Sequence, residues 1–344
     1  MVYTDTFQSV LMIVASIVLT IIAFFKVGGI EKIIEATPAD YWVLFRPAND
    51  STFPWTAMVF GYPVMAIWFW CTDQTIVQRV LGARNINEGQ LGALFAGFLK
   101  ILPPFIFIFP GILCYILYPN LKNPDQAYMT MITQLLPTGM VGLIVAVLIA
   151  ALISTIDSAL NSFSTIFTLD VYCAKFRPKA NAREIRRVGR IMTLLIAILS
   201  VFIALSMESF GKDLFNLLQG IIAFFAPPMS AVFLIGVLWR KATAKAALLT
   251  LILGSVISLA VGFCQFKEFP NADFWPHYLL LSFYLFIGIS VFMVTISLMT
   301  QKTNTPSALL TFKEINAKMD NPKFIWGLWF VLACIMVSFY LIFN

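Results

Sequence analysis

Apolar segments, each about as long as a bilayer is thick, follow one another along almost the whole chain. They number about nine and cover residues 7–25, 55–81, 91–118, 141–172, 191–205, 215–238, 246–263, 278–299 and 324–343. In lipid every backbone polar group needs a partner within the protein, so such segments fold as helices. The chain is 60% hydrophobic and only 12% charged, and a soluble domain would carry about twice that charge. We therefore predict an all-α polytopic membrane protein whose residues 1–344 form a single transmembrane domain.

Positive charge is concentrated in a few short connecting segments. The formal net charge is +6, and the most basic segment is 175–190. Lys and Arg mark cytoplasmic loops, so this segment is predicted to lie inside the cell. Alternation of the spans then puts the N-terminus inside and the C-terminus outside, and the basic segments 78–89, 240–245 and 301–323 also fall inside. The charge indicates topology, and no nucleic-acid partner is predicted.

One span differs from the others in its polar content. Residues 150–172 place their polar side chains within one helical face about 160° wide. These residues are Ser154, Thr155, Asp157, Ser158, Asn161, Ser162, Thr165 and Thr168. Such a stripe has two interpretations: small-residue packing between helices, or a set of hard oxygen ligands for an alkali cation. The adjacent Ser154 and Thr155, with Asp157 close by, favour the ion site.

Two spans contain helix breakers in mid-membrane. Gly61 and Pro63 are predicted to interrupt the segment 55–81, and 226–228 (Ala-Pro-Pro) to break the segment 215–238 a short distance after Gln219. Broken helices at membrane depth line cavities, and transporters bind their substrates at such breaks. Lys100, just before two prolines, fits either a snorkelling position or a cavity.

Residues for enzymatic chemistry are sparse. The five cysteines lie far apart without a CxxC pair, and His277 is the single histidine. Nothing in the sequence pairs Asp73 with Asp157 as general acid and base. We expect no enzyme, no metal other than an alkali ion and no organic cofactor.

Several spaced motifs together resemble the sodium:solute symporter family, and most of all its sodium/glucose cotransporter branch. They are 70–74 (WCTDQ) with 76–79 (IVQR), 97–100 (GFLK), Ser154-Thr155 with 160–162 (LNS), and Gln219 ahead of 226–228 (APP). The resemblance implies a leucine-transporter-type inverted-repeat fold. Residues 7–25 would be the last helix of the first repeat, 55–238 the second repeat and 239–344 trailing helices. The chain would lack most of the first repeat and look N-terminally truncated.

The same resemblance implies a sodium site made of the Ala151 carbonyl and the hydroxyls of Ser154 and Thr155. It also suggests a second cation or proton site at Asp157 and Ser158. The implied substrate-binding residues are Phe69, Trp70, Lys100 and Gln219. The sequence departs from sugar transporters at Phe69, where they typically have Tyr, and at Ala66, where they have Asn or Thr.

The function implied is sodium-coupled symport of a sugar or polyol, such as glucose or galactose, by alternating access in the plasma (cell inner) membrane. The partners would be the sodium ion, the solute and the lipid bilayer, with the oligomeric state open. Two alternatives remain at this point. The solute would instead be an amino acid, a vitamin, sialic acid or another carboxylate, with Lys100 as its partner, or the chain would be a truncated fragment that does not transport.

Overall fold

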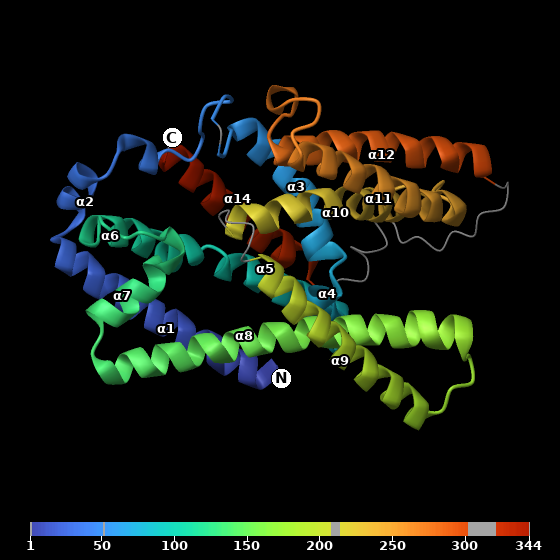
Figure 1. Cartoon of the computed structure of the whole chain (residues 1–344), viewed down its shortest axis with the longest axis horizontal. Helices are drawn as coiled ribbons and strands as arrows, with labels where there is room; N and C mark the ends of the chain where they lie inside the picture. The colour runs from blue at the N-terminus through green and yellow to red at the C-terminus, as the bar shows by residue number, and fades with distance from the viewer. Residues whose placement is uncertain (1, 51, 208–213, 302–320, 344) are drawn as a thin grey trace. The chain divides into compact units, whose positions relative to one another are not determined.

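A computed structural model describes residues 2–50, 52–207, 214–301 and 321–343 of the chain, and the regular elements of these residues are helices (Figure 1). The predicted all-α fold is confirmed. The elements are α1 Val2–Val27, α2 Ile30–Ala36, η1 Ala39–Trp42, α3 Trp55–Cys71, α4 Gln74–Leu81, α5 Ile86–Leu99, η2 Pro104–Ile108, α6 Phe109–Leu117, η3 Pro124–Gln126, α7 Ala127–Leu135, α8 Thr138–Ile166, η4 Phe167–Phe176, α9 Ala182–Met207, α10 Leu214–Leu238, α11 Ala244–Phe266, η6 Ala272–Phe274, α12 Tyr278–Thr300 and α14 Pro322–Ile342. Most of the predicted inside segment 301–323 lies outside the described residues.

The long helices are those of a multi-pass membrane protein. Eight helical segments within the described residues are long and apolar enough to cross a bilayer, with mean hydropathies of 2.0 to 2.7. The ninth predicted span corresponds to α3, which is apolar but only 17 residues long and is followed by the short α4. The span prediction is thus confirmed for eight segments, and α3 is shorter than expected.

The chain divides into two compact units. Unit 1 comprises Met1–Tyr41 and Ala96–Gly211, and unit 2 comprises Trp42–Phe95 and Lys212–Asn344. The predicted division into a repeat and trailing helices has other boundaries than these two units, and it stays a prediction.

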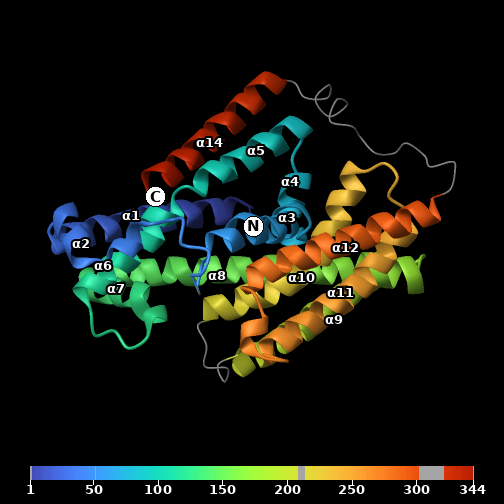
Figure 2. The ribbon, with the colours of Figure 1, turned by 90° about the horizontal axis from the view of Figure 1, so that it is seen from above.

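In unit 1 the helix α1 packs against α6, α7 and α8 (Figure 2), and α9 crosses α8 (Figure 1). Small and polar residues let α1 approach its neighbours: Ser16 is fully buried and its hydroxyl lies 2.7 Å from the hydroxyl of Tyr128 on α7. The start of α1 contacts the middle of α8, and its middle contacts α7, which precedes α8. The helices α1 and α8 therefore run in opposite directions, which agrees with the predicted alternation of spans.

In unit 2 the helix α10 packs against α3, α11 and α12, and α12 also contacts α3 and α11 (Figure 1). The centre of this unit is the cluster Ala57, Met65, Ala223, Ala226 and Leu279. Gly61 on α3 is buried because the backbone of Leu279 on α12 occupies the place where a Cβ would lie. Close backbone approach through small residues is how helices associate in lipid, where apolar side chains gain nothing by leaving the tails.

The predicted helix breaks at prolines are wrong. Pro63 lies inside α3 and the pair Pro227 and Pro228 inside α10, and both helices continue through them. A proline lacks the N–H that would bond the carbonyl four residues earlier, so Pro228 leaves the Phe224 carbonyl without its helical partner. The Ser258 hydroxyl of α11 donates to that carbonyl at 2.6 Å. This replacement bond keeps α10 continuous in an apolar surrounding.

The interruptions occur at other places. Between α3 and α4 the chain turns at Thr72 and Asp73, where the Asp73 carboxylate caps α4 by accepting a hydrogen bond from the Thr75 backbone N–H at 2.9 Å. The predicted third span is interrupted after Lys100 and continues through the π-helical turn η2 into α6. The segment 119–137, which lies between two predicted spans, contains the helix α7.

Candidate functional site

The polar face of α8 is divided between exposed and buried side chains. Ser158 and Ser162 are buried and Ser154 is half-buried, whereas Thr155 and Asp157 are exposed. The helix continues beyond Ile166 as the π-helical segment η4, so the predicted 150–172 stretch is one continuous helical element. The residues proposed for the sodium site, from Ala151 to Thr155, lie within about one turn of α8.

A carboxylate from α1 joins this face. The Ser154 hydroxyl donates a 2.6 Å hydrogen bond to Oδ1 of Asp5. Asp5 was missed from the sequence because it precedes the first predicted span, 7–25. In the structure α1 begins at Val2, so Asp5 belongs to its first turn. An acidic residue inside a membrane helix is the signal that would have identified it.

The hydroxyl protons on this part of α8 are directed to other oxygens. Thr155 donates to the Ala151 carbonyl at 3.0 Å, and Ser158 donates to the Ser154 carbonyl at 3.0 Å. A hydroxyl has two further lone pairs, and these remain available to a cation when the proton is already donated. With the Asp5 carboxylate the group offers several hard oxygens and one formal negative charge, which suits an alkali cation.

The opposite edge of the polar face serves helix packing. The Ser164 hydroxyl donates to the Gly189 carbonyl of α9 at 2.8 Å, and Thr168 is buried nearby. A Cβ on Gly189 would lie 3.4 Å from the Ser164 hydroxyl oxygen and 3.7 Å from that of Thr168. Packing therefore explains this edge, of which only Thr168 belongs to the predicted stripe, and ion ligation at Ser154 stays a prediction.

The second cation or proton site, Asp157 with Ser158, is not assembled in the same way. Asp157 is exposed and makes no hydrogen bond or ion pair among the residues that the structure describes, while Ser158 is buried. A role for Asp157 stays a prediction.

Three of the proposed substrate residues belong to unit 2. Gln219 on α10 donates to the Tyr62 hydroxyl on α3 at 3.4 Å. Tyr62 lies four and seven positions before Ala66 and Phe69, so these residues share one face of α3. The rings of Phe69 and Trp70 meet edge to face, with centroids 5.1 Å apart and an interplanar angle of 88°. Tyr62 was missed, although its phenol at helical spacing from Phe69 could have indicated it.

Lys100 belongs to unit 1. Its backbone N–H donates to the Ala96 and Gly97 carbonyls at the end of α5, and its side chain is exposed at the interruption before Pro103. The predicted substrate residues are thus distributed over both units, and their common site stays a prediction.

Residues 1–254 match a known protein family, described as the sodium:solute symporter family. The chain belongs to this family. The resemblance predicted from the motifs is thereby confirmed. Within the family it is similar to sodium/myo-inositol cotransporter 2 of Oryctolagus cuniculus, with 36% identity over 351 aligned positions, 89% of this chain and 52% of that protein.

Two further symporters have a similar sequence identity to the chain. Identity to the sodium/mannose cotransporter of Bos taurus is 35%, over 76% of this chain and 49% of that protein. Identity to sodium/glucose cotransporter 4 of Danio rerio is 32%, over 87% of this chain and 51% of that protein. The chain spans about half the length of the curated relatives it matches.

A solved symporter structure has the same fold. The substrate-bound outward-open state of a Na⁺-coupled sialic acid symporter matches with a TM-score of 0.70 and 22% identity, over 90% of this chain and 63% of that chain. The predicted leucine-transporter-type fold class is confirmed by this likeness.

Proposed function

We propose that the chain takes part in sodium-coupled symport of a sugar or polyol by alternating access in the plasma membrane. The observation that carries this proposal is the group formed by the Ala151 carbonyl, Ser154, Thr155 and Asp5, whose hydroxyl protons are donated to other oxygens. Family membership supports the coupling to sodium. The names of the relatives, which include inositol, mannose and glucose cotransporters, support a polyhydroxylated solute such as glucose, galactose or inositol.

Coupling follows from linkage between the two ligands. A cation bound between α1 and α8 favours one arrangement of the helices, and a solute that binds the same arrangement gains affinity by the same factor. The membrane potential adds about 2.3 kcal/mol per charge per 100 mV to sodium entry. Gln219, Tyr62 and the Phe69–Trp70 pair would contact the solute by hydrogen bonds and ring stacking, and Lys100 would donate to its hydroxyls. Asp157 and Ser158 are the proposed second cation or proton site.

The test uses the full chain in proteoliposomes. Uptake of labelled glucose and of labelled inositol is measured with a sodium gradient and with choline in place of sodium. Thr155→Val removes one proposed ligand and is expected to abolish the sodium-dependent part. Thr295→Val is the matched control, because Thr295 is also exposed and donates to its own helix, to the Val291 carbonyl at 2.9 Å.

A second measurement does not require transport. Sodium that binds the folded chain raises its melting temperature relative to choline at equal concentration, and Thr155→Val should remove that shift while Thr295→Val keeps it. Equal melting temperatures in the two salts, or a sodium shift that survives Thr155→Val, would contradict the sodium site. Sodium-driven uptake that small carboxylates inhibit and sugars do not would contradict the sugar assignment.

A further inference from the structure

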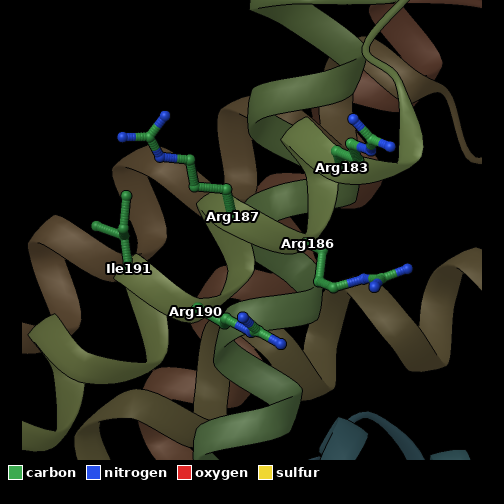
Figure 3. Close-up of a pocket in the computed structure, with 5 residues that line it drawn as sticks. All are labelled: Arg183, Arg186, Arg187, Arg190 and Ile191. Carbon is green, nitrogen blue, oxygen red and sulfur yellow. The ribbon is translucent and has the colours of Figure 1, made fainter.

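The first turns of α9 carry four exposed arginines within a sector about 100° wide around the helix axis. Arg183, Arg186, Arg187 and Arg190 follow one another at helical spacing and, with Ile191, line a pocket of about 450 Å³. In Figure 3 the guanidinium groups of Arg186 and Arg190 extend to one side of the helix and the side chains of Arg187 and Ile191 to the other. Positive charge therefore lies on both flanks of this part of the helix.

Nothing in α9 neutralises this charge. Its single acidic residue, Glu184, is half-buried and turned to other partners: it accepts a 2.7 Å hydrogen bond from the Tyr172 hydroxyl and lies 3.9 Å from Nε of Arg177. Among the described residues no ion pair reaches the four arginines. They also lie at the positive end of the helix dipole, where added cations are unfavourable for the helix and anions are favoured. The arrangement therefore concentrates positive potential for an external anion.

An exposed apolar stripe continues the arginine face along the helix. Leu194, Val201 and Leu205 lie 11, 18 and 22 positions after Arg183, within about 40° of it around the axis. Their side chains are 62%, 59% and 65% exposed. The side of α9 that faces α8 through Gly189 is turned about 120° from Arg183 around the axis. The arginines and this apolar stripe thus form one continuous exposed surface. It is charged in the first turns of α9 and aliphatic in the later turns.

The length of α9 sets the depth of the arginines. The span Ala182–Ser206 has 25 residues and is about 38 Å long, whereas the hydrocarbon core is about 30 Å thick. The polar first turns are the part that extends beyond the core, so the guanidinium groups lie at the level of the lipid headgroups.

We propose that the arginine pocket of α9 binds the headgroup of a membrane lipid that carries more than one phosphate, with its acyl chains along Leu194, Val201 and Leu205. Arginine binds phosphate oxygens through two parallel hydrogen bonds, and the row of four can hold phosphates at more than one point. A soluble phosphate would use the arginines but not the apolar stripe below them. This site goes beyond the proposed transport function and does not depend on it.

The test uses the purified full chain in detergent, so the measured binding does not depend on insertion into a membrane. Short-chain phosphatidylinositol 4,5-bisphosphate is titrated and its binding measured by thermophoresis, next to short-chain phosphatidylserine and to inositol trisphosphate without acyl chains. We expect saturable binding of the bisphosphate lipid, and binding at least about tenfold weaker for the other two.

Two matched pairs of substitutions separate the pocket from the general charge of the segment. Arg187→Gln with Arg190→Gln should weaken binding about tenfold or more, whereas Lys175→Gln with Lys179→Gln removes the same charge outside the pocket and should change it less than about twofold. Arg187→Lys with Arg190→Lys keeps the charge and the fold, and should still weaken binding about threefold through loss of the paired hydrogen bonds.

The proposal is overturned if the two Gln pairs weaken binding equally, or if the Lys pair binds as tightly as the native chain. Equal affinity for phosphatidylserine would show attraction by diffuse charge. Equal affinity for inositol trisphosphate would show an anion site that needs no lipid.

Discussion

The hydroxyl of Ser154 on α8 and the carboxylate of Asp5 on α1 are joined by a hydrogen bond of 2.6 Å across 149 positions of sequence. This bond brings a formal negative charge to a face that otherwise offers only neutral oxygens at Ala151 and Thr155. A carboxylate attracts a cation over a longer range than a hydroxyl does. This attraction is stronger where little water is present. The charge of Asp5 should therefore decide how strongly this face attracts sodium.

Replacing Asp5 by Asn tests this directly. The amide keeps a hydrogen-bond acceptor for Ser154 but removes the charge, so the fold should lose only about 1 kcal/mol, the difference between a charge-assisted and a neutral bond. The rise in melting temperature caused by sodium, compared with choline, should disappear. Glu31→Gln on α2 removes the same charge in unit 1 away from α8 and should keep the shift. A sodium shift of native size in Asp5→Asn would show that the carboxylate has no part in binding.

The Ser258 hydroxyl should be needed for the stability of unit 2. Ser258→Ala leaves the Phe224 carbonyl without a partner, and hydrogen bonds between membrane helices contribute about 0.6 kcal/mol on average and up to about 1.7. We expect a loss near the upper value, because Pro228 provides no backbone N–H in its place. The free energy of unfolding is measured by titration with a denaturing detergent. Ser338→Ala is the control, since Ser338 is exposed and bonds within its own helix at 2.8 Å; equal losses in the two variants would argue against a special role for Ser258.

Gly61 should tolerate no side chain. Gly61→Ala directs a Cβ into the backbone of Leu279, which has no flexible end that can move aside. Overpacking of this kind costs about 1 to 3 kcal/mol, and more where backbone must shift. Gly92→Ala on α5 meets nothing within 4 Å and should be neutral or stabilising by up to about 1 kcal/mol. Both are compared by detergent unfolding, and a neutral Gly61→Ala would rule out the close contact between α3 and α12.

The start of α12 should weaken as the pH falls. Nδ1 of His277 accepts from the Leu279 backbone N–H at 3.3 Å, and its Nε2 lies 3.0 Å from the Thr52 carbonyl. Burial lowers the pKa of His277 below 6.5, against smaller opposing effects of the Thr52 hydrogen bond and the Asp50 charge. The unfolded chain therefore takes up the proton first, so stability is full above about pH 6.5 and declines as the pH falls from there towards the folded pKa. Protonation of Nδ1 also removes the cap.

A melting curve at each pH from 7 to 5 measures this effect, and the melting temperature should fall as the pH falls. The pKa of Asp50 is lowered from 3.8 by the backbone N–H groups of Phe53 and Thr52, so its carboxylate stays ionised in that window. His277→Gln should flatten the dependence. If the slope persists in that variant, another group is responsible.

The apolar pattern was sufficient to predict the helical class, eight of the spans and the polar face of α8, because membrane depth permits few alternatives to a helix. The breaks predicted at Pro63 and at Pro227–Pro228 were wrong, and at Pro228 the reason lies outside the segment. The bond that replaces the missing helical one at Phe224 comes from Ser258, 34 positions away.

The contributions of Asp5 and Tyr62 were missed for a related reason. Each looked like an ordinary residue within its own segment, and each became significant only when the fold brought it to Ser154 or Gln219. The residues of α8 and α10 could be named from motifs, whereas their partners on α1 and α3 depend on helix packing that no local pattern encodes.

The Ser258–Phe224 bond also limits how unit 2 can move. Because α10 depends on a hydroxyl of α11 for one of its own backbone acceptors, α10 cannot rotate about its axis or slide along α11 without exposing that acceptor to the membrane interior. The two helices should therefore tilt as one rigid piece during any transport cycle. A hinge in this unit would have to lie outside that pair, and neither at the prolines nor in the turn 239–243 that joins the two helices.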